Sequence, residues 1–82
     1  MAMDAKQLVW RCRRGVRELD VLFGRFLEQS YPALDENGKR AFERLLDVQD
    51  PEIMDWLFGR EHSPDPELQA LIESLQRLSG LD

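Results

Sequence analysis

Hydrophobic residues recur along the chain at steps of three and four positions, the spacing that places side chains on one face of an α-helix. The first stripe of this kind consists of Ala5, Leu8, Val9 and Cys12. It predicts a helix from about Asp4 to Arg14 that ends near Gly15, where a left-handed glycine would close it. The second stripe consists of Leu19, Leu22, Phe23, Phe26 and Leu27. It predicts another amphipathic helix, which ends before Tyr31 and Pro32.

Three further helices are predicted by hydrophobic stripes that follow a capping residue. Asp35 is suited to cap a third helix, although Gly38 in its first turn weakens that start. The runs Asp50-Pro51-Glu52 and Asp65-Pro66-Glu67 each offer an aspartate cap, a proline whose missing N–H does not matter, and an acid near the positive end of the helix dipole. They predict a fourth and a fifth helix. No segment has sustained strand alternation, so we expect an all-α fold: one domain over residues 1–82, built as a compact bundle of about five short helices.

Composition favours a binding protein over an enzyme or a metalloprotein. A domain of 82 residues buries only about 60% of its unfolded surface, which leaves little volume for an enclosed active site. Hydrophobic residues make up 43% of the chain and charged residues 33%, as is typical of a folded protein rather than a disordered one. Because Cys12 is the one cysteine and His62 the one histidine, neither an internal disulfide nor a thiolate or imidazole metal cluster is expected.

The sequence predicts neither a membrane span nor a secretory signal. Its uninterrupted apolar runs are only a few residues long, whereas a spanning helix needs about 20. The first residues include Asp4 and lack the apolar stretch of a signal peptide. We therefore expect a cytoplasmic protein.

Charge is distributed unevenly, because residues 1–25 carry six basic and three acidic side chains while the remainder carries five and thirteen. The basic cluster near the N-terminus contains Arg11, Arg13, Arg14 and Arg17. Such a cluster can contact phosphates and guanine edges. However, Glu18 and Asp20 interrupt it, and the net charge of −5 opposes general affinity for nucleic acid. We expect no nucleic-acid partner.

Several chemically capable residues have simpler structural interpretations. His62 lies among turn residues with no nucleophile nearby in sequence, so its side chain is expected to be solvated. Cys12 lies on the first stripe and is predicted to be a small buried hydrophobe, although neighbouring arginines would lower the pKa of its thiol. The run Trp56-Leu57-Phe58 is predicted to form the core or its edge. Trp10 lies off the first stripe beside Arg11, which makes it a candidate contact residue at an interface.

The segment Arg14-Gly15-Val16-Arg17-Glu18 is predicted to form a corner between the first two helices, and these five residues are termed the corner below. A structural interpretation accounts for two of them, since Gly15 can end one helix and Glu18 can sit in the first turn of the next. The same geometry would display an arginine and a glutamate beside an opened backbone, with further arginines nearby. The corner is therefore the predicted surface for binding a partner.

The run Trp10-Arg11-Cys12-Arg13-Arg14-Gly15-Val16-Arg17-Glu18-Leu19-Asp20 closely resembles the succinate dehydrogenase flavinylation factors, also termed FAD assembly factors. The later runs Phe42-x-x-Leu45-Leu46 and Asp50-Pro51-Glu52-Ile53-Met54-Asp55-Trp56-Leu57 extend the likeness over nearly the whole chain. The hallmark of this family is an Arg-Gly-x-x-Glu motif, which Arg14, Gly15 and Glu18 match. The family's five-helix bundle also agrees with the helices predicted here.

The resemblance implies that the chain promotes covalent attachment of FAD to a histidine in the flavoprotein subunit of succinate dehydrogenase, with fumarate reductase as a second client. The flavin would belong to the partner, so this chain is expected to have no cofactor and no catalytic residue of its own. The partner-binding residues are expected to be Arg14, Gly15, Glu18, Trp10, Arg11, Arg17 and Asp20. Two alternatives remain: an antitoxin-type or other interaction module, and direct carriage of FAD, against which the absence of a Gly-rich phosphate loop argues.

Overall fold

The computed structural model describes residues 4–80, with every side chain in that range except that of Ala5. Within this range the chain forms five α-helices and one short 3₁₀ helix, and no strand. In chain order the elements are α1 (Ala5–Arg11), α2 (Arg17–Gln29), η1 (Tyr31–Ala33), α3 (Glu36–Leu45), α4 (Asp50–Leu57) and α5 (Pro66–Ser79). The predicted all-α bundle of about five short helices is therefore confirmed.

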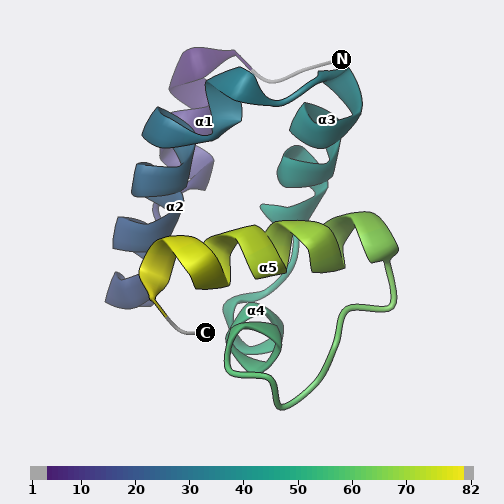
Figure 1. Cartoon of the computed structure of the whole chain (residues 1–82). Coiled ribbons are helices and arrows are strands. Elements are labelled where there is room, and N and C mark those ends of the chain that lie inside the picture. Colours follow the sequence, from purple (N-terminus) through teal and green to yellow (C-terminus); the bar gives the residue numbers. More distant parts are fainter. Residues whose placement is uncertain (1–3, 81–82) are drawn as a thin grey trace.

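The last helix, α5, packs against three of the other helices. Figure 1 shows α5 crossing both α2 and α3, and α4 lies below α5 in this view. Helix α5 contacts all three of these helices. Its buried face consists of Leu68, Leu71, Ile72 and Leu75. These four residues have the spacing of one helical face, so a single hydrophobic stripe of α5 packs against α2, α3 and α4. By contrast, α1 packs mainly against α2 and lies at the edge of the bundle.

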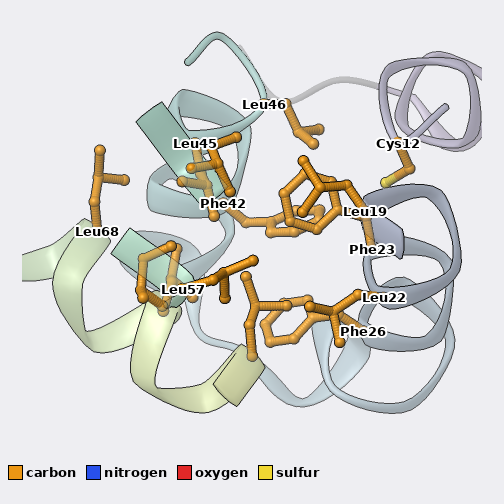
Figure 2. Packing of buried hydrophobic residues seen from close by; sticks show 14 of the residues in the cluster. Cys12, Leu19, Leu22, Phe23, Phe26, Phe42, Leu45, Leu46, Leu57 and Leu68 are labelled. Atoms are coloured by element: carbon orange, nitrogen blue, oxygen red, sulfur yellow. The ribbon is translucent and has the colours of Figure 1, made fainter. Parts of the chain in front are cut away.

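Phe42 of α3 is the centre of the aromatic core. Its ring stacks on that of Phe26 with 4.9 Å between centroids and meets the edge of Phe23 at 5.9 Å. Figure 2 shows these rings among aliphatic side chains from the surrounding helices. Phe23, Phe26 and Phe42 are each at most 1% exposed, so their burial contributes heavily to the stability of a bundle this small.

Capping chemistry explains most helix starts. Asp4 accepts a hydrogen bond from the Gln7 backbone N–H at 2.9 Å, and the Asp4 backbone N–H donates in turn to Gln7 Oε1 at 3.2 Å, which completes a capping box on α1. Asp35 caps α3 as predicted, by accepting from the Gly38 N–H at 2.7 Å. Gly38 does not simply weaken that start: a Cβ there would lie only 3.2 Å from both Asp35 Oδ1 and the Leu34 Cβ. Asp65 caps α5, also as predicted.

Two predictions about helix boundaries are wrong: the end of the first helix and the cap of the fourth. The first helix ends at Arg11, three residues earlier than expected, and Gly15 does not close it, because within residues 4–80 a positive φ occurs only at Gly59 and Gly80. Asp50 does not cap α4, whose N-cap position is taken by Gln49 with no side-chain hydrogen bond. Instead of capping its own helix, the Asp50 side chain accepts hydrogen bonds from Arg14 and Gly15, in the segment between α1 and α2.

Two predicted buried residues are also exposed. Val9 is 53% exposed because α1 packs mainly on α2 and buries only a narrow face, formed by Leu8 and Cys12. The side chain of Ala5, another member of that stripe, lies outside the described part of the structure. Phe58 is 51% exposed because it follows the last residue of α4, whereas Trp56 and Leu57 are buried as predicted.

Candidate functional site

Residues 12–16 join α1 to α2 without helical structure, and the Arg14 side chain turns inward from this segment toward the α3–α4 connection. The Arg14 guanidinium donates to the backbone carbonyl oxygens of Leu46 at 2.8 Å and Val48 at 2.5 Å. It also donates to the carbonyl of Arg11 at 3.2 Å, near the end of α1. The Arg14 side chain thus binds the corner to backbone groups more than thirty residues away in the sequence.

Asp50 completes this anchor from the first residue of α4. Its Oδ1 accepts from Arg14 Nε at 2.7 Å, and its Oδ2 accepts from the Gly15 backbone N–H at 3.2 Å. Both side chains of the ion pair are mostly buried, with Arg14 11% and Asp50 21% exposed. Because a partly buried, charge-assisted pair is stronger than an exposed one, this contact fixes the position of the corner.

A second carboxylate supports the corner from α2. Asp20 accepts a hydrogen bond from the Arg14 backbone N–H. The Arg14 guanidinium also lies 5.7 Å from the centroid of the Phe23 ring in the core. The prediction that Arg14 is displayed at the surface of the corner is therefore wrong. The Arg14 side chain points inward, and Asp20 binds the backbone of the corner.

Gly15 is exposed, and no contact within residues 4–80 requires a glycine at this position. Its φ is not in the left-handed region, and a Cβ would meet only Asp50 Oδ2, at an ordinary van der Waals distance of 3.7 Å. A glycine that no internal contact requires allows another molecule to approach this backbone closely.

The remaining predicted contact residues lie at the surface around the corner. Trp10 is 73% exposed, as expected from its position off the hydrophobic stripe. Glu18 and Arg17 are exposed in the first turn of α2, and no carboxylate within residues 4–80 pairs with Arg17. Arg11 forms an exposed ion pair with Asp47. The structure thus separates the predicted set into inward anchors and outward side chains.

A polar cleft of about 390 Å³ runs between the corner and residues 46–50. It is lined by Arg11, Arg13, Arg14, Gly15 and the loop that Arg14 binds. Arginine side chains and backbone groups can bind an anionic or polar surface, and the two carboxylates in the lining, Asp47 and Asp50, form ion pairs with Arg11 and Arg14. These groups are suited to recognition of a polar or charged surface.

Cys12 and His62 have no place in this cleft. Cys12 is 4% exposed at the edge of the core, as predicted, and its position in the cluster is visible in Figure 2. Burial raises the pKa of its thiol to about 11, which outweighs the opposing effect of the positive charge on Arg14. His62 is exposed, as expected. Among residues 4–80, no group of three or more metal-binding side chains is present, and no helix is long and apolar enough to cross a membrane.

Asp50 is the site residue that sequence reasoning missed. Its sequence context, an aspartate before proline at the start of a helix, is that of a cap, and that local explanation concealed the long-range one. The carbonyl groups of Leu46 and Val48 carry no sequence signal at all, because every residue has one.

Comparison with known proteins identifies the family of this chain. Residues 6–79 match the model of a family described as flavinator of succinate dehydrogenase. The chain is 41% identical over 78 residues to a FAD assembly factor SdhE from Coxiella burnetii, with 95% of each chain covered. It is 44% identical over 70 residues to that of Shewanella oneidensis, covering 85% of each, and 42% identical over 77 residues to that of Pectobacterium atrosepticum, covering 93% of this chain and 88% of the relative. With a match over nearly its full length, the chain belongs to the family of succinate dehydrogenase flavinators.

Proposed function

We propose that this chain is an FAD assembly factor that binds the immature flavoprotein subunit of succinate dehydrogenase and promotes covalent attachment of FAD to its histidine. The single observation that carries this proposal is the family match over residues 6–79. The names of relatives more than 40% identical over most of their length agree with it. We extend the proposal to the fumarate reductase flavoprotein as a second client, and to the cytoplasm as the place of action.

The corner contributes by docking and alignment. Arg14, Asp20 and Asp50 hold the backbone in one conformation, so little conformational entropy is lost when a partner binds. Gly15 then allows the partner to approach the backbone closely, and Glu18 offers an exposed carboxylate one helical turn away. Holding two reacting groups in the correct geometry accelerates a reaction without any chemical participation by the holder.

The flavin and the reacting histidine both belong to the partner in this proposal. The corner supplies hydrogen-bond donors, one exposed carboxylate and a rigid backbone, and we assign no proton transfer or nucleophilic attack to any residue of this chain. Trp10, Arg11 and Arg17 surround the corner and would add contact area to the complex.

Two substitutions at Gly15 separate folding from docking. Gly15→Ala and Gly15→Arg are both expected to fold, because Gly15 is exposed and a Cβ there would meet only Asp50 Oδ2, at 3.7 Å. We expect Gly15→Arg to abolish flavinylation in a reconstituted mixture of apo-flavoprotein, FAD and chain, and Gly15→Ala to impair it less. Covalent flavin is measured by fluorescence of the denatured flavoprotein subunit.

Glu18→Ala tests the second motif residue against Glu28→Ala, a matched change at another exposed glutamate on the same helix. We expect Glu18→Ala to lower the rate of flavinylation and Glu28→Ala to leave it unchanged, while both variants keep wild-type circular dichroism. Full activity of Glu18→Ala would remove Glu18 from the docking surface.

A further inference from the structure

An apolar groove begins at the corner and is lined by residues of α2 and α4. It has a volume of about 500 Å³ and lies between α2 and α4, with Ser79 at the end of α5 closing one side. Val21 and Phe58 line it and are 53% and 51% exposed, and Met54 contributes a flexible thioether side chain. Glu18 belongs both to the corner and to the lining of this groove.

Phe58 is held in place at the wall of the groove. The Arg60 guanidinium lies 5.3 Å from the centroid of the Phe58 ring, and Arg60 is itself fixed by an ion pair of 2.7 Å with Asp55. The ring is therefore supported on one side by a cation while it remains half exposed. A supported, exposed aromatic ring can bind a partner at little entropic cost.

Two arginines that form no ion pair in the described part of the chain flank the groove. Arg17 and Arg25 line it, and within residues 4–80 neither is in an ion pair, although the chain has 16 acidic residues against 11 basic ones. Arg17, Val21 and Arg25 occur at four-residue spacing, so they lie in one row along the surface of α2. At a rise of 1.5 Å per residue, the two arginine backbones are about 12 Å apart along the helix.

The corner alone is too small to hold a protein. A stable complex buries about 800 Å² on each partner and involves roughly 20 to 30 residues a side, so the contact must extend beyond residues 14–18. The groove continues directly from Glu18 and combines an apolar centre with a charged rim, which is the usual arrangement of such interfaces.

We propose that this groove binds a segment of the flavoprotein partner in which a bulky apolar side chain lies between two carboxylates, spaced to reach two arginines whose backbones are about 12 Å apart along α2. The apolar side chain fills the space between Val21 and Phe58, and the carboxylates pair with Arg17 and Arg25. This assignment rests on the proposed function, because it takes the flavoprotein as the partner. It adds a second contact region on α2 and α4 that lies outside the Arg-Gly-x-x-Glu motif.

Binding of the purified flavoprotein subunit to the full chain tests the groove. Arg25→Glu and Val21→Glu place a negative charge in the groove at exposed positions and are expected to weaken binding by about tenfold or more. The controls Arg40→Glu on α3 and Ala70→Glu on α5 introduce the same changes in charge at exposed positions elsewhere and are expected to leave the dissociation constant unchanged. Circular dichroism establishes that all four variants are folded.

A photo-reactive residue at position 58 identifies the occupant. We expect cross-linking to a flavoprotein peptide that contains acidic residues around an apolar one, and no cross-link from the control position 70. Wild-type affinity for both groove variants, or a cross-link to a basic peptide or to a second copy of this chain, would overturn the groove assignment and leave the proposed function intact. If the wild-type chain itself fails to bind the flavoprotein, both proposals are wrong.

Discussion

Replacing Asp50 with alanine is expected to destabilise the whole bundle, although Asp50 is a surface-proximal residue at the start of a short helix. The substitution removes the acceptor for both Arg14 Nε and the Gly15 N–H. It leaves the Arg14 guanidinium, which is only 11% exposed, without its counter-ion. Removing one member of such a pair costs more than the pair itself contributes, because the remaining charge stays partly desolvated.

The magnitude follows from the contacts that remain. A hydrogen bond to a charged group contributes about 1.5–3 kcal/mol, and complete loss of a partner for a buried charge costs about 3–5 kcal/mol. Arg14 retains the carbonyls of Leu46, Val48 and Arg11, and Asp50 is 21% exposed, so water can replace part of the interaction. We therefore expect Asp50→Ala to lower the free energy of unfolding by about 2 kcal/mol, a large share of the roughly 4–12 kcal/mol expected for a chain of this length.

Asp47→Ala is the matched control, because Asp47 lies in the same connection and also pairs with an arginine. Its partner is Arg11, and the two side chains are 67% and 42% exposed, so we expect a loss of about 0.5 kcal/mol or less. Urea unfolding followed by far-ultraviolet circular dichroism measures both variants. In a double-mutant cycle, Arg14→Ala and Asp50→Ala together are expected to cost less than the sum of the single changes, by about 1–2 kcal/mol. Equal, small losses for Asp47→Ala and Asp50→Ala would refute the anchoring role of the Arg14–Asp50 pair.

Three further predictions concern the rest of the fold. Phe42→Ala is expected to cost about 3–5 kcal/mol, since the ring is fully buried against two other phenylalanines, and a loss below about 1 kcal/mol in urea unfolding would contradict this packing. Asp35→Ala is expected to cost about 1 kcal/mol through loss of the α3 cap, whereas Asp35→Asn is expected to cost less, because its side-chain oxygen can still accept from the Gly38 N–H; equal losses would argue against the cap. The pKa of the Cys12 thiol is raised from 9.0 to about 11 in the folded chain, so its contribution to stability is complete below pH 9 and is lost as the pH rises from 9 toward 11. Cys12→Ala is expected to remove this part of the pH dependence, and an unchanged alkaline profile would contradict the assignment.

The structure divides the residues of the corner by function. Arg14, together with Asp20 and Asp50, builds the conformation, whereas Gly15 and Glu18 remain exposed. A loss of activity on changing Arg14 would therefore have a structural origin, accompanied by a loss of stability. A loss on changing Glu18 would have a recognition origin, at unchanged stability. Measuring unfolding and flavinylation on the same variants distinguishes the two.

The helices were predictable because each depends on local information. Periodic hydrophobic residues and the caps at Asp35 and Asp65 act within a few positions of the chain, and both caps are present. Asp50 shows where such reasoning fails, since its local context is that of a cap while its side chain binds groups 35 and 36 positions away. The exposure of Val9 and Phe58 was equally hidden, because periodicity shows which residues share a face but not how many neighbours that face will have.

The sequence predicted a segment for the candidate site, and partner binding there stays a prediction, but it did not predict which side chains of that segment point inward. The Arg-Gly-x-x-Glu pattern placed the surface at residues 14–18, and the structure places a polar cleft beside them. Which members point inward depends on carbonyl groups of the α3–α4 connection, which have no sequence signature. The groove between α2 and α4 was not anticipated either, since it arises from the packing of helices that are distant in sequence.

Flavin fluorescence of the denatured succinate dehydrogenase flavoprotein subunit, produced in cells with and without this chain, tests the central claim most directly, because only covalently bound flavin survives denaturation. We expect the signal to disappear without the chain, to return with the wild type, and to remain absent with Gly15→Arg, which is expected to fold. An undiminished signal in cells that lack the chain would contradict its proposed role as an FAD assembly factor for this enzyme.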